Sequence, residues 1–257
     1  MEGAGKPLTV AVLVKQVPDM NAVKVDRAAG TPILSSQQVV NSYDEYAIEE
    51  ALRLKERFGG EVVAVTAGPA GAKDVLTRAL AMGADRAVHV EISDPNGLDT
   101  LAVAELLADQ IRPLAADLVL AGQASDDYET GQVGAQVAEL LGLPLVSSVV
   151  AVEVTDSGFR LRRDMEDGYQ TVRAPMPSLL LTSTGLNEPR FPSLKGIMAA
   201  KKKPIERVPS GAETGARATW SAPTVPERGG TGVVLQDVPA ADAVKQLVSW
   251  LEEQKVL

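Results

Sequence analysis

The sequence predicts an α/β protein with a doubly wound, mostly parallel sheet, a β-hairpin extension and a C-terminal arm that ends in a helix. Three observations support this prediction. Up to about residue 144, short apolar runs alternate with amphipathic segments, as strands and helices do around a buried parallel sheet. Segments with the composition of β-strands follow as far as residue 182. From residue 204 the chain becomes rich in Pro, Gly, Ser, Thr and Ala and loses its periodicity.

The alternating part contains four expected strands and four expected helices. The strands are the apolar runs at residues 8–14, 61–65, 86–90 and 117–120. Ser42 and Glu45 have the spacing of a capping box, which predicts that the first helix begins at Ser42. Each helix ends where glycine or proline follows its apolar face. The four helices cover about residues 42–58, 72–82, 99–111 and 130–141.

The next part of the chain is expected to extend the same sheet. Its strands are residues 146–154, 158–162, 169–173 and 178–182, with turns at Gly158 and Gly168. We therefore expect residues 1–203 to form one α/β domain and residues 204–257 to form an arm. In the helix expected at 240–253, Val244, Leu247 and Leu251 share one face, which needs a partner surface.

Composition excludes several classes of function. The 25 Lys and Arg residues stand against 34 Asp and Glu, and the net charge of −9 disfavours binding to nucleic acid. The absence of cysteine excludes disulfides, thiolate nucleophiles and Cys-ligated clusters. We expect the single histidine, His89, to be a strand residue without a catalytic task. No run is long enough to enter a membrane and the N-terminus lacks a signal segment, so we expect a cytoplasmic protein if the source is prokaryotic.

A ligand of such a sheet is expected at the carboxyl ends of its strands. The loop at residues 122–132 follows the fourth strand and runs into a helix, with Gly131 and Gly134 near the first turn. Backbone N–H groups exposed there would bind an anion such as a nucleotide phosphate, with donors from Thr130 and Gln132. Equally, Thr130 could be only an N-cap and the glycines could only allow close packing. Neither a Walker A sequence nor a G-x-G-x-x-G fingerprint is present.

Two charged groups allow more than one interpretation. Asp126 and Asp127 could bind Mg²⁺ or act in acid–base chemistry, although adjacent carboxylates in a loop are more often turn or capping groups. Lysines 201–203 could form a patch for nucleic acid or membrane. On an acidic chain they are more simply the solvated end of a helix.

Several segments together resemble the beta subunit of electron-transfer flavoproteins. They are residues 41–55, 79–86, 127–132, 186–190 and 197–203, and their order is more specific than any one of them. The resemblance implies a Rossmann-like domain and an electron carrier rather than an enzyme. It also implies a heterodimer with an alpha subunit, which provides most contacts to a redox FAD at the interface, and a structural AMP in the beta subunit. Electrons would pass from acyl-CoA or related dehydrogenases to a membrane quinone reductase.

The resemblance also implies which residues bind ligands and partners. Residues 15–20 should face the flavin, and Leu194, within a recognition loop at 186–203, should insert into a dehydrogenase. Alternatively, Leu194 simply begins a helix that ends at Lys203. The implied AMP site comprises Leu13, Asn41, Ser42, Tyr43, Asp44, Ala67, Gly122, Gln123, Ala124, Ser125, Asp126, Asp127, Tyr128, Glu129, Thr130, Gly131 and Gln132.

Two alternatives stay open. Ser42 replaces a proline that is frequent in the family, and residues 43–45 and 130–134 partly resemble its bifurcating branch. In that branch a second, redox-active FAD takes the place of AMP and NADH is the electron donor. A stand-alone sensor of adenine nucleotides on the same type of sheet is the alternative from another class. The apolar helix at the end of the arm argues against such a sensor.

Overall fold

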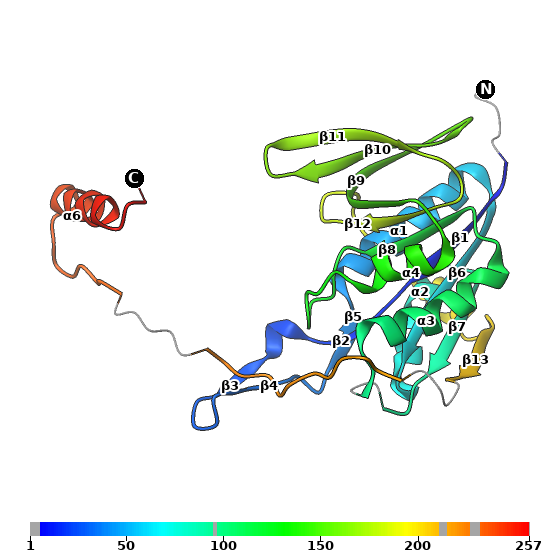
Figure 1. Ribbon diagram of the computed structural model, residues 1–257, viewed down its shortest axis with the longest axis horizontal. Coiled ribbons are helices and arrows are strands. Elements are labelled where there is room, and N and C mark those ends of the chain that lie inside the picture. Colours follow the sequence, from blue (N-terminus) through cyan, green and yellow to red (C-terminus); the bar gives the residue numbers. More distant parts are fainter. Residues whose placement is uncertain (1–5, 95–96, 211–214, 227–231, 257) are drawn as a thin grey trace.

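The computed structural model describes residues 6–94, 97–210, 215–226 and 232–256, and its main feature is a nine-stranded sheet (Figure 1). The strands are β1 (Leu8–Leu13), β6 (Gly60–Gly68), β7 (Arg86–Glu91), β8 (Leu118–Gly122), β9 (Leu145–Thr155), β10 (Gly158–Met165), β11 (Gly168–Ala174), β12 (Ser178–Thr182) and β13 (Ile205–Pro209). Their order is β11-β10-β9-β12-β8-β1-β6-β7-β13. From β9 to β13 the neighbours are parallel, whereas β10 is antiparallel to both β9 and β11. The predicted fold class and its hairpin extension are confirmed.

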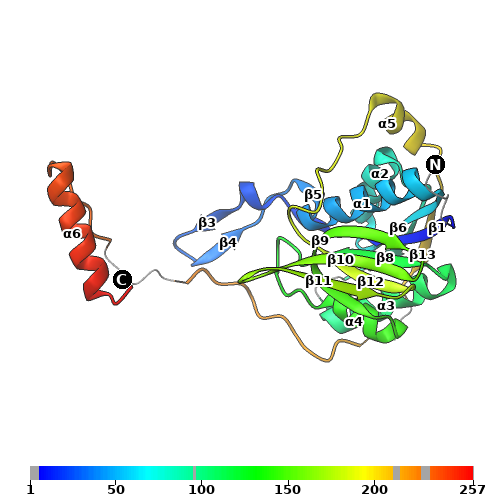
Figure 2. The ribbon, with the colours of Figure 1, turned by 90° about the horizontal axis from the view of Figure 1, so that it is seen from above.

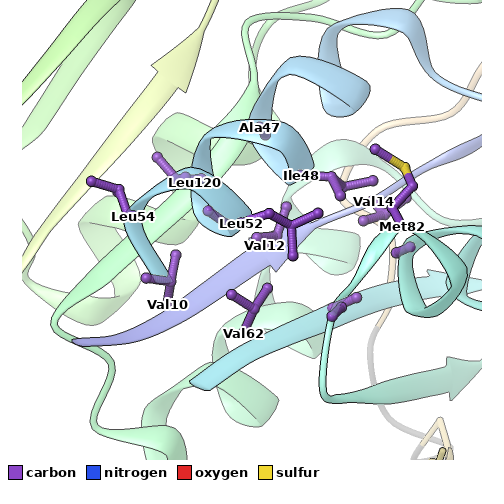
Figure 3. Close-up of a cluster of buried hydrophobic side chains, with 14 of the residues drawn as sticks. Val10, Val12, Val14, Ala47, Ile48, Leu52, Leu54, Val62, Met82 and Leu120 are labelled. Atoms are coloured by element: carbon purple, nitrogen blue, oxygen red, sulfur yellow. The ribbon is translucent and has the colours of Figure 1, made fainter. Parts of the chain in front are cut away.

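Helices cover both faces of this sheet, because its strands alternate apolar side chains between two cores. Val10 and Val12 of β1 pack on one face with α1 and α2, while Ala11 and Leu13 pack on the other with α3 and α4. Figure 3 shows the first of these cores, where Ile48 and Leu52 of α1 lie over β1. The helices are α1 (Ser42–Phe58), α2 (Lys73–Met82), α3 (Thr100–Ile111), α4 (Val133–Leu141), α5 (Leu194–Ala200) and α6 (Ala240–Glu253).

Helix α1 begins at Ser42, as predicted, but without the predicted capping box, and the predicted start of α4 is wrong. The N-cap of α1 is Asn41, and the hydroxyl of Ser42 donates to Asp126 instead of capping its own helix. The capping box does not form, because the Ser42 hydroxyl binds the Asp126 carboxylate of a distant loop rather than an N–H group of α1. Helix α4 begins at Val133, not near Thr130, since Gly131 has a positive φ of 62° that interrupts the helical path.

The edge strand β13 lies beyond the expected end of the domain at residue 203. It pairs in parallel with β7, and its Ile205 and Val208 pack against the cores on opposite faces of the sheet. Neighbouring His89 lies in β7, as expected, and is buried with its Nε2 atom 3.1 Å from the carbonyl oxygen of Gly68. The sheet therefore continues to Pro209, into the segment that was expected to begin the arm.

The segment between β1 and α1 forms two small antiparallel pairs that the sequence pattern did not indicate. Strands β2 (Gln16–Pro18) and β5 (Gln38–Val40) pair beside the sheet. Strands β3 (Lys24–Asp26) and β4 (Thr31–Ile33) form a hairpin that projects away from the domain (Figures 1 and 2). Short 3₁₀ turns, η1 (Met20–Ala22), η2 (Ala70–Ala72) and η4 (Arg112–Leu114), complete the local structure.

The arm leaves the domain and ends in α6, which lies apart from the sheet in both views (Figures 1 and 2). On the way, Val225 N–H donates to the carbonyl of Gly30 at the tip of the β3–β4 hairpin. No residue of α6 is buried, and its apolar residues Val244, Leu247, Val248 and Trp250 are exposed. Among the described residues no helix is long and apolar enough to cross a membrane.

Candidate functional site

The candidate site lies at the carboxyl ends of β1, β6 and β8, where the 122–132 loop meets the start of α1. Asn41 joins the two elements, because its Nδ2 donates to Ala124 O at 2.8 Å and its Oδ1 accepts from Asp126 N at 2.9 Å. Asp126 completes the junction. Its carboxylate accepts from Ser42 N at 2.8 Å and from the Ser42 hydroxyl at 2.6 Å.

Asp44 connects the same junction to the ends of β1 and β8. Its two carboxylate oxygens accept from Lys15 N at 2.7 Å, just after β1, and from Gly122 N at 3.0 Å, at the end of β8. Burial raises the pKa of Asp44 to about 7, although hydrogen bonds from Lys15, Asn41 and Gly122 act in the opposite direction. A Cβ atom on Gly122 would lie 2.4 Å from Oδ1 of Asp44, so only glycine lets the loop approach this closely.

Lys15 links the loop to the end of β1 through its side chain. The ammonium lies 2.6 Å and 2.8 Å from the two carboxylate oxygens of Asp127, donates to Ser125 Oγ at 3.2 Å, and lies 4.9 Å from the centre of the Tyr128 ring. Asp126 and Asp127 are therefore bound to a helix end and to a lysine. Within the described residues no cluster of three or more His, Asp or Glu could hold a metal ion.

The far side of the loop is tied to β9, β12 and α3. Gln123 N donates to Thr182 O at 2.9 Å, and its side-chain oxygen accepts from Ser148 N at 2.7 Å. The hydroxyl of Thr182 donates to Tyr43 O at 3.1 Å, which brings Tyr43 to the same edge. Thr100 of α3 donates to the side-chain oxygen of Gln132 at 2.8 Å.

The beginning of α4 has no side-chain cap. Its N-cap residue is Gln132, so the interpretation of Thr130 as the N-cap is wrong. A Cβ on Gly134 would lie 2.4 Å from Leu181, and this glycine therefore does allow close packing, as the simpler interpretation proposed. Nearby, Gln136 Oε1 is buried and has no hydrogen-bond partner among the described residues.

The remaining residues of the implied AMP site lie at its edges. Leu13 is buried in the core under α3 and α4, and Ala67 is partly buried at the end of β6. Glu129 has a left-handed φ of 50° and donates its N–H to Ser125 O at 2.8 Å. Beside the loop is a cavity of about 790 Å³, whose charged lining consists of Asp19, Glu45, Asp74, Arg78, Asp126 and Glu129.

The arm crosses this site through Trp220, which sequence reasoning missed. Its indole ring lies 4.7 Å from the ring of Tyr128, and its Nε1 donates to Leu98 O at 3.0 Å. Just before it, the N–H groups of Arg217 and Ala218 donate to Asp99, whose carboxylate also caps α3. The one available signal was that Trp220 is one of two tryptophans, placed in an otherwise aperiodic segment.

The recognition loop expected at residues 186–203 contains α5. Leu194 is the first residue of this helix, which ends at Ala200 rather than at Lys203, and Leu194 is 76% exposed. Its insertion into a dehydrogenase stays a prediction. Lys203 was expected to be solvated. Instead, its ammonium donates to the carbonyls of Leu80 and Ala84 at the end of α2, because a cation is favoured at a helix C-terminus.

Comparisons of the sequence with other proteins identify its family. A family model described as the electron transfer flavoprotein domain matches residues 33–213. A protein named electron transfer flavoprotein subunit beta from Bacillus subtilis is 35% identical and covers 97% of this chain and 100% of its own. One of the same name from Bradyrhizobium diazoefficiens is 37% identical over 93% of this chain and 97% of its own. The caffeyl-CoA reductase-Etf complex subunit CarD of Acetobacterium woodii is 40% identical over 77% of each chain.

The chain therefore belongs to the electron transfer flavoprotein family, as a beta subunit. The resemblance found in the sequence is confirmed. Membership implies an electron-transfer role, the involvement of a flavin and an alpha-subunit partner.

Proposed function

We propose that this chain forms a heterodimer with an alpha subunit and carries electrons from dehydrogenases, such as acyl-CoA dehydrogenases, to a membrane quinone reductase. The redox FAD is held mainly by the alpha subunit at the interface, and the beta subunit holds a structural AMP. The electron-carrying role is supported by membership of the family. The observation that carries the AMP site is the junction of the 122–132 loop with residues 41–44, beside a helix that lacks a side-chain cap.

The residues at this junction fit a nucleoside monophosphate. The N-terminal N–H groups of α4 have no capping side chain, so they can donate to a phosphate, with Thr130 and Gln132 nearby. Gln136 Oε1 offers a buried acceptor for an amino or hydroxyl group of the nucleoside. The loop is already held by Asn41, Asp126 and Lys15, so AMP would brace a structure that these side chains define.

Charge in the neighbouring cavity favours AMP over a second FAD. Among the described residues, five of the six charged groups that line this cavity are carboxylates, and the cation Arg78 pairs with Glu45 at 2.8 Å. A dinucleotide that extended from the loop into this cavity would bring its second phosphate close to these carboxylates, and like charges repel.

The alternative is a bifurcating subunit, with a second FAD in the AMP site and NADH as electron donor. It is supported by the patterns at residues 43–45 and 130–134 and by the 40% identity to a subunit named as part of a caffeyl-CoA reductase-Etf complex. A stand-alone sensor of adenine nucleotides is less consistent with α6, whose apolar face is exposed in the single chain.

Extraction of the nucleotides from the purified heterodimer tests these proposals. We expect one FAD and one AMP per heterodimer, measured by chromatography of the denatured protein. Two FAD molecules and no AMP would replace our proposal with the bifurcating alternative. A folded homo-oligomer that binds AMP and does not associate with an alpha subunit would support the sensor.

A further inference from the structure

Arg190 connects the recognition segment, residues 186–203, to the outer side of α1. Its Nε and Nη2 donate to the two carboxylate oxygens of Glu49 at 2.8 Å and 3.0 Å, and its backbone N–H donates to the same carboxylate at 3.1 Å. On its other edge the guanidinium donates to both carboxylate oxygens of Glu56. A planar fork that binds two carboxylates fixes the orientation of the arginine as well as its position.

Glu49 makes this contact strong, because only 3% of its surface is exposed. Burial alone would raise the pKa of Glu49, but hydrogen bonds from Arg190 and Arg53 hold it below its usual range. The carboxylate therefore stays charged near neutral pH, and removal of its partners would leave a buried charge unpaired.

Asn187 forms a second anchor on the same helix. Its Nδ2 donates to Tyr46 O at 3.0 Å and to Glu50 at 3.1 Å. Glu50 is also buried, and burial raises its pKa. The stretch that leads from β12 to α5 is thus bound to α1 through both Asn187 and Arg190.

The other end of the segment is anchored on α2. A Cβ atom on Gly196 would lie 2.3 Å from Ala81 O, so α5 rests directly on the backbone at the end of α2. Lys203 then binds the carbonyls of Leu80 and Ala84. Anchors on both sides therefore leave little freedom for the residues between them.

The residues between these anchors carry large apolar side chains that the fold leaves in solvent. Phe191 is 87% exposed, Leu194 76% and Met198 65%. Arg190 directly precedes the first of them. Ordering a flexible loop costs affinity when it binds, and a loop that is held beforehand avoids this cost.

We propose that Arg190 is a positioning residue for partner docking, which holds Phe191 and Leu194 in a fixed orientation by binding Glu49 and Glu56. The inference goes beyond the proposed function and rests on the docking role of residues 186–203 that the family resemblance implies. Arg190 does not contact the partner in this proposal, so its effect is on the order of the segment and through it on the affinity for a dehydrogenase.

The test uses the intact heterodimer with its flavin and an acyl-CoA dehydrogenase from the same source, with butyryl-CoA as reductant. We expect Arg190→Ala to raise the KM of the dehydrogenase for the heterodimer about threefold to tenfold at unchanged kcat. The reason is that the recognition segment must then become ordered when the dehydrogenase binds. Arg190→Lys should recover part of this loss. Glu56→Gln, which removes only the exposed contact, should raise the KM about twofold and avoids an unpaired buried charge.

Arg53→Ala is the matched control. Arg53 also binds Glu49, at 2.9 Å, but does not touch the recognition segment. The KM of the dehydrogenase for the Arg53→Ala heterodimer should therefore equal its KM for the unaltered heterodimer. Hydrogen exchange provides a readout without any partner, and amides 190–198 should exchange faster in Arg190→Ala and not in Arg53→Ala.

Two results would overturn the proposal in distinguishable ways. If Leu194→Ala raises the KM and Arg190→Ala leaves both the KM and the exchange of residues 190–198 unchanged, Arg190 has no positioning role. If Leu194→Ala leaves the KM unchanged too, the docking role implied by the family resemblance is wrong, and the inference fails with it.

Discussion

The α/β domain and the arm use the same kind of amphipathic helix in opposite ways. Helix α1 buries its apolar face, including Ala47, Ile48 and Leu52, against the sheet. Helix α6 has an equally regular apolar face, but none of its residues is buried. Periodicity therefore predicts that a face will be covered, and it does not identify the surface that covers it. For α1 that surface is in the same chain, and for α6 we expect it in the alpha subunit.

The largest effect on subunit affinity is expected from a charge in the apolar face of α6. Leu247→Asp should weaken the heterodimer at least tenfold, about 1.4 kcal/mol, because an aspartate cannot be buried there without a partner. Ser249→Asp, on the opposite side of the same helix, should have little effect. Analytical ultracentrifugation measures the subunit affinity of both variants. Equal loss of affinity in both variants, or in neither, would show that this face is not the contact surface.

A pH-dependent effect is expected in the domain, from Asp44. Its pKa is about 7 in the folded chain and about 4 when unfolded, so between these values the folded state binds more protons. The contribution of Asp44 to stability is therefore greatest at low pH and decreases as the pH rises to about 7, by up to about 1.4 kcal/mol per pH unit.

Thermal unfolding of the heterodimer tests this prediction with Asp44→Asn. The melting temperature of the unaltered protein minus that of the variant should fall from pH 5 to pH 7 and stay constant from pH 7.5 to pH 8.5. A difference that rises over the lower interval would mean that the pKa of Asp44 is depressed by its N–H donors.

The smallest effect is expected on the release of AMP, from a change where the arm meets the domain. Trp220→Ala removes the ring contact with Tyr128 and the hydrogen bond to Leu98, so AMP should leave the heterodimer about threefold to tenfold faster, as expected for the loss of an aromatic pair worth about 0.5–1.5 kcal/mol. Trp220→Phe keeps an aromatic ring against Tyr128, so its rate of AMP release should stay close to that of the unaltered protein. Release of AMP after dilution, followed by chromatography, measures the rates. Equal rates of AMP release from all three proteins would show that Trp220 of the arm does not affect the AMP site.

Local sequence was sufficient for most elements of the domain and insufficient for their ends. The apolar runs that became β1, β6, β7 and β8 were recognisable because strands buried on both faces contain little else. Thr130 misled because the positive φ of Gly131 delays the start of α4. Ser42 misled because the groups that bind a side chain at a helix end need not be local. The donors of Ser42 bind a carboxylate 84 residues away in the chain. Strand β13 was missed because Glu206 and Arg207 make a short edge strand resemble a loop.

The candidate site shows the same division. Its position could be predicted, since the carboxyl ends of parallel strands meet at one edge and the loop before α4 carries the glycines that such an edge needs. The side chains that hold it, Lys15 on Asp127 and Asp44 on Gly122, could not be paired from sequence, because 112 and 78 residues separate the partners.

The sequence by itself determined the α/β sheet and an apolar helix that requires a partner, because these depend on composition and local periodicity. It also determined the family, through the resemblance of several segments in a specific order. Only the tertiary structure decided that Arg190 holds the recognition segment on α1, that Trp220 lies over the 122–132 loop and that Leu194 remains in solvent. The physical reason is that hydrogen bonds, ion pairs and exposure depend on distances in space, which chain folding sets among residues far apart in sequence.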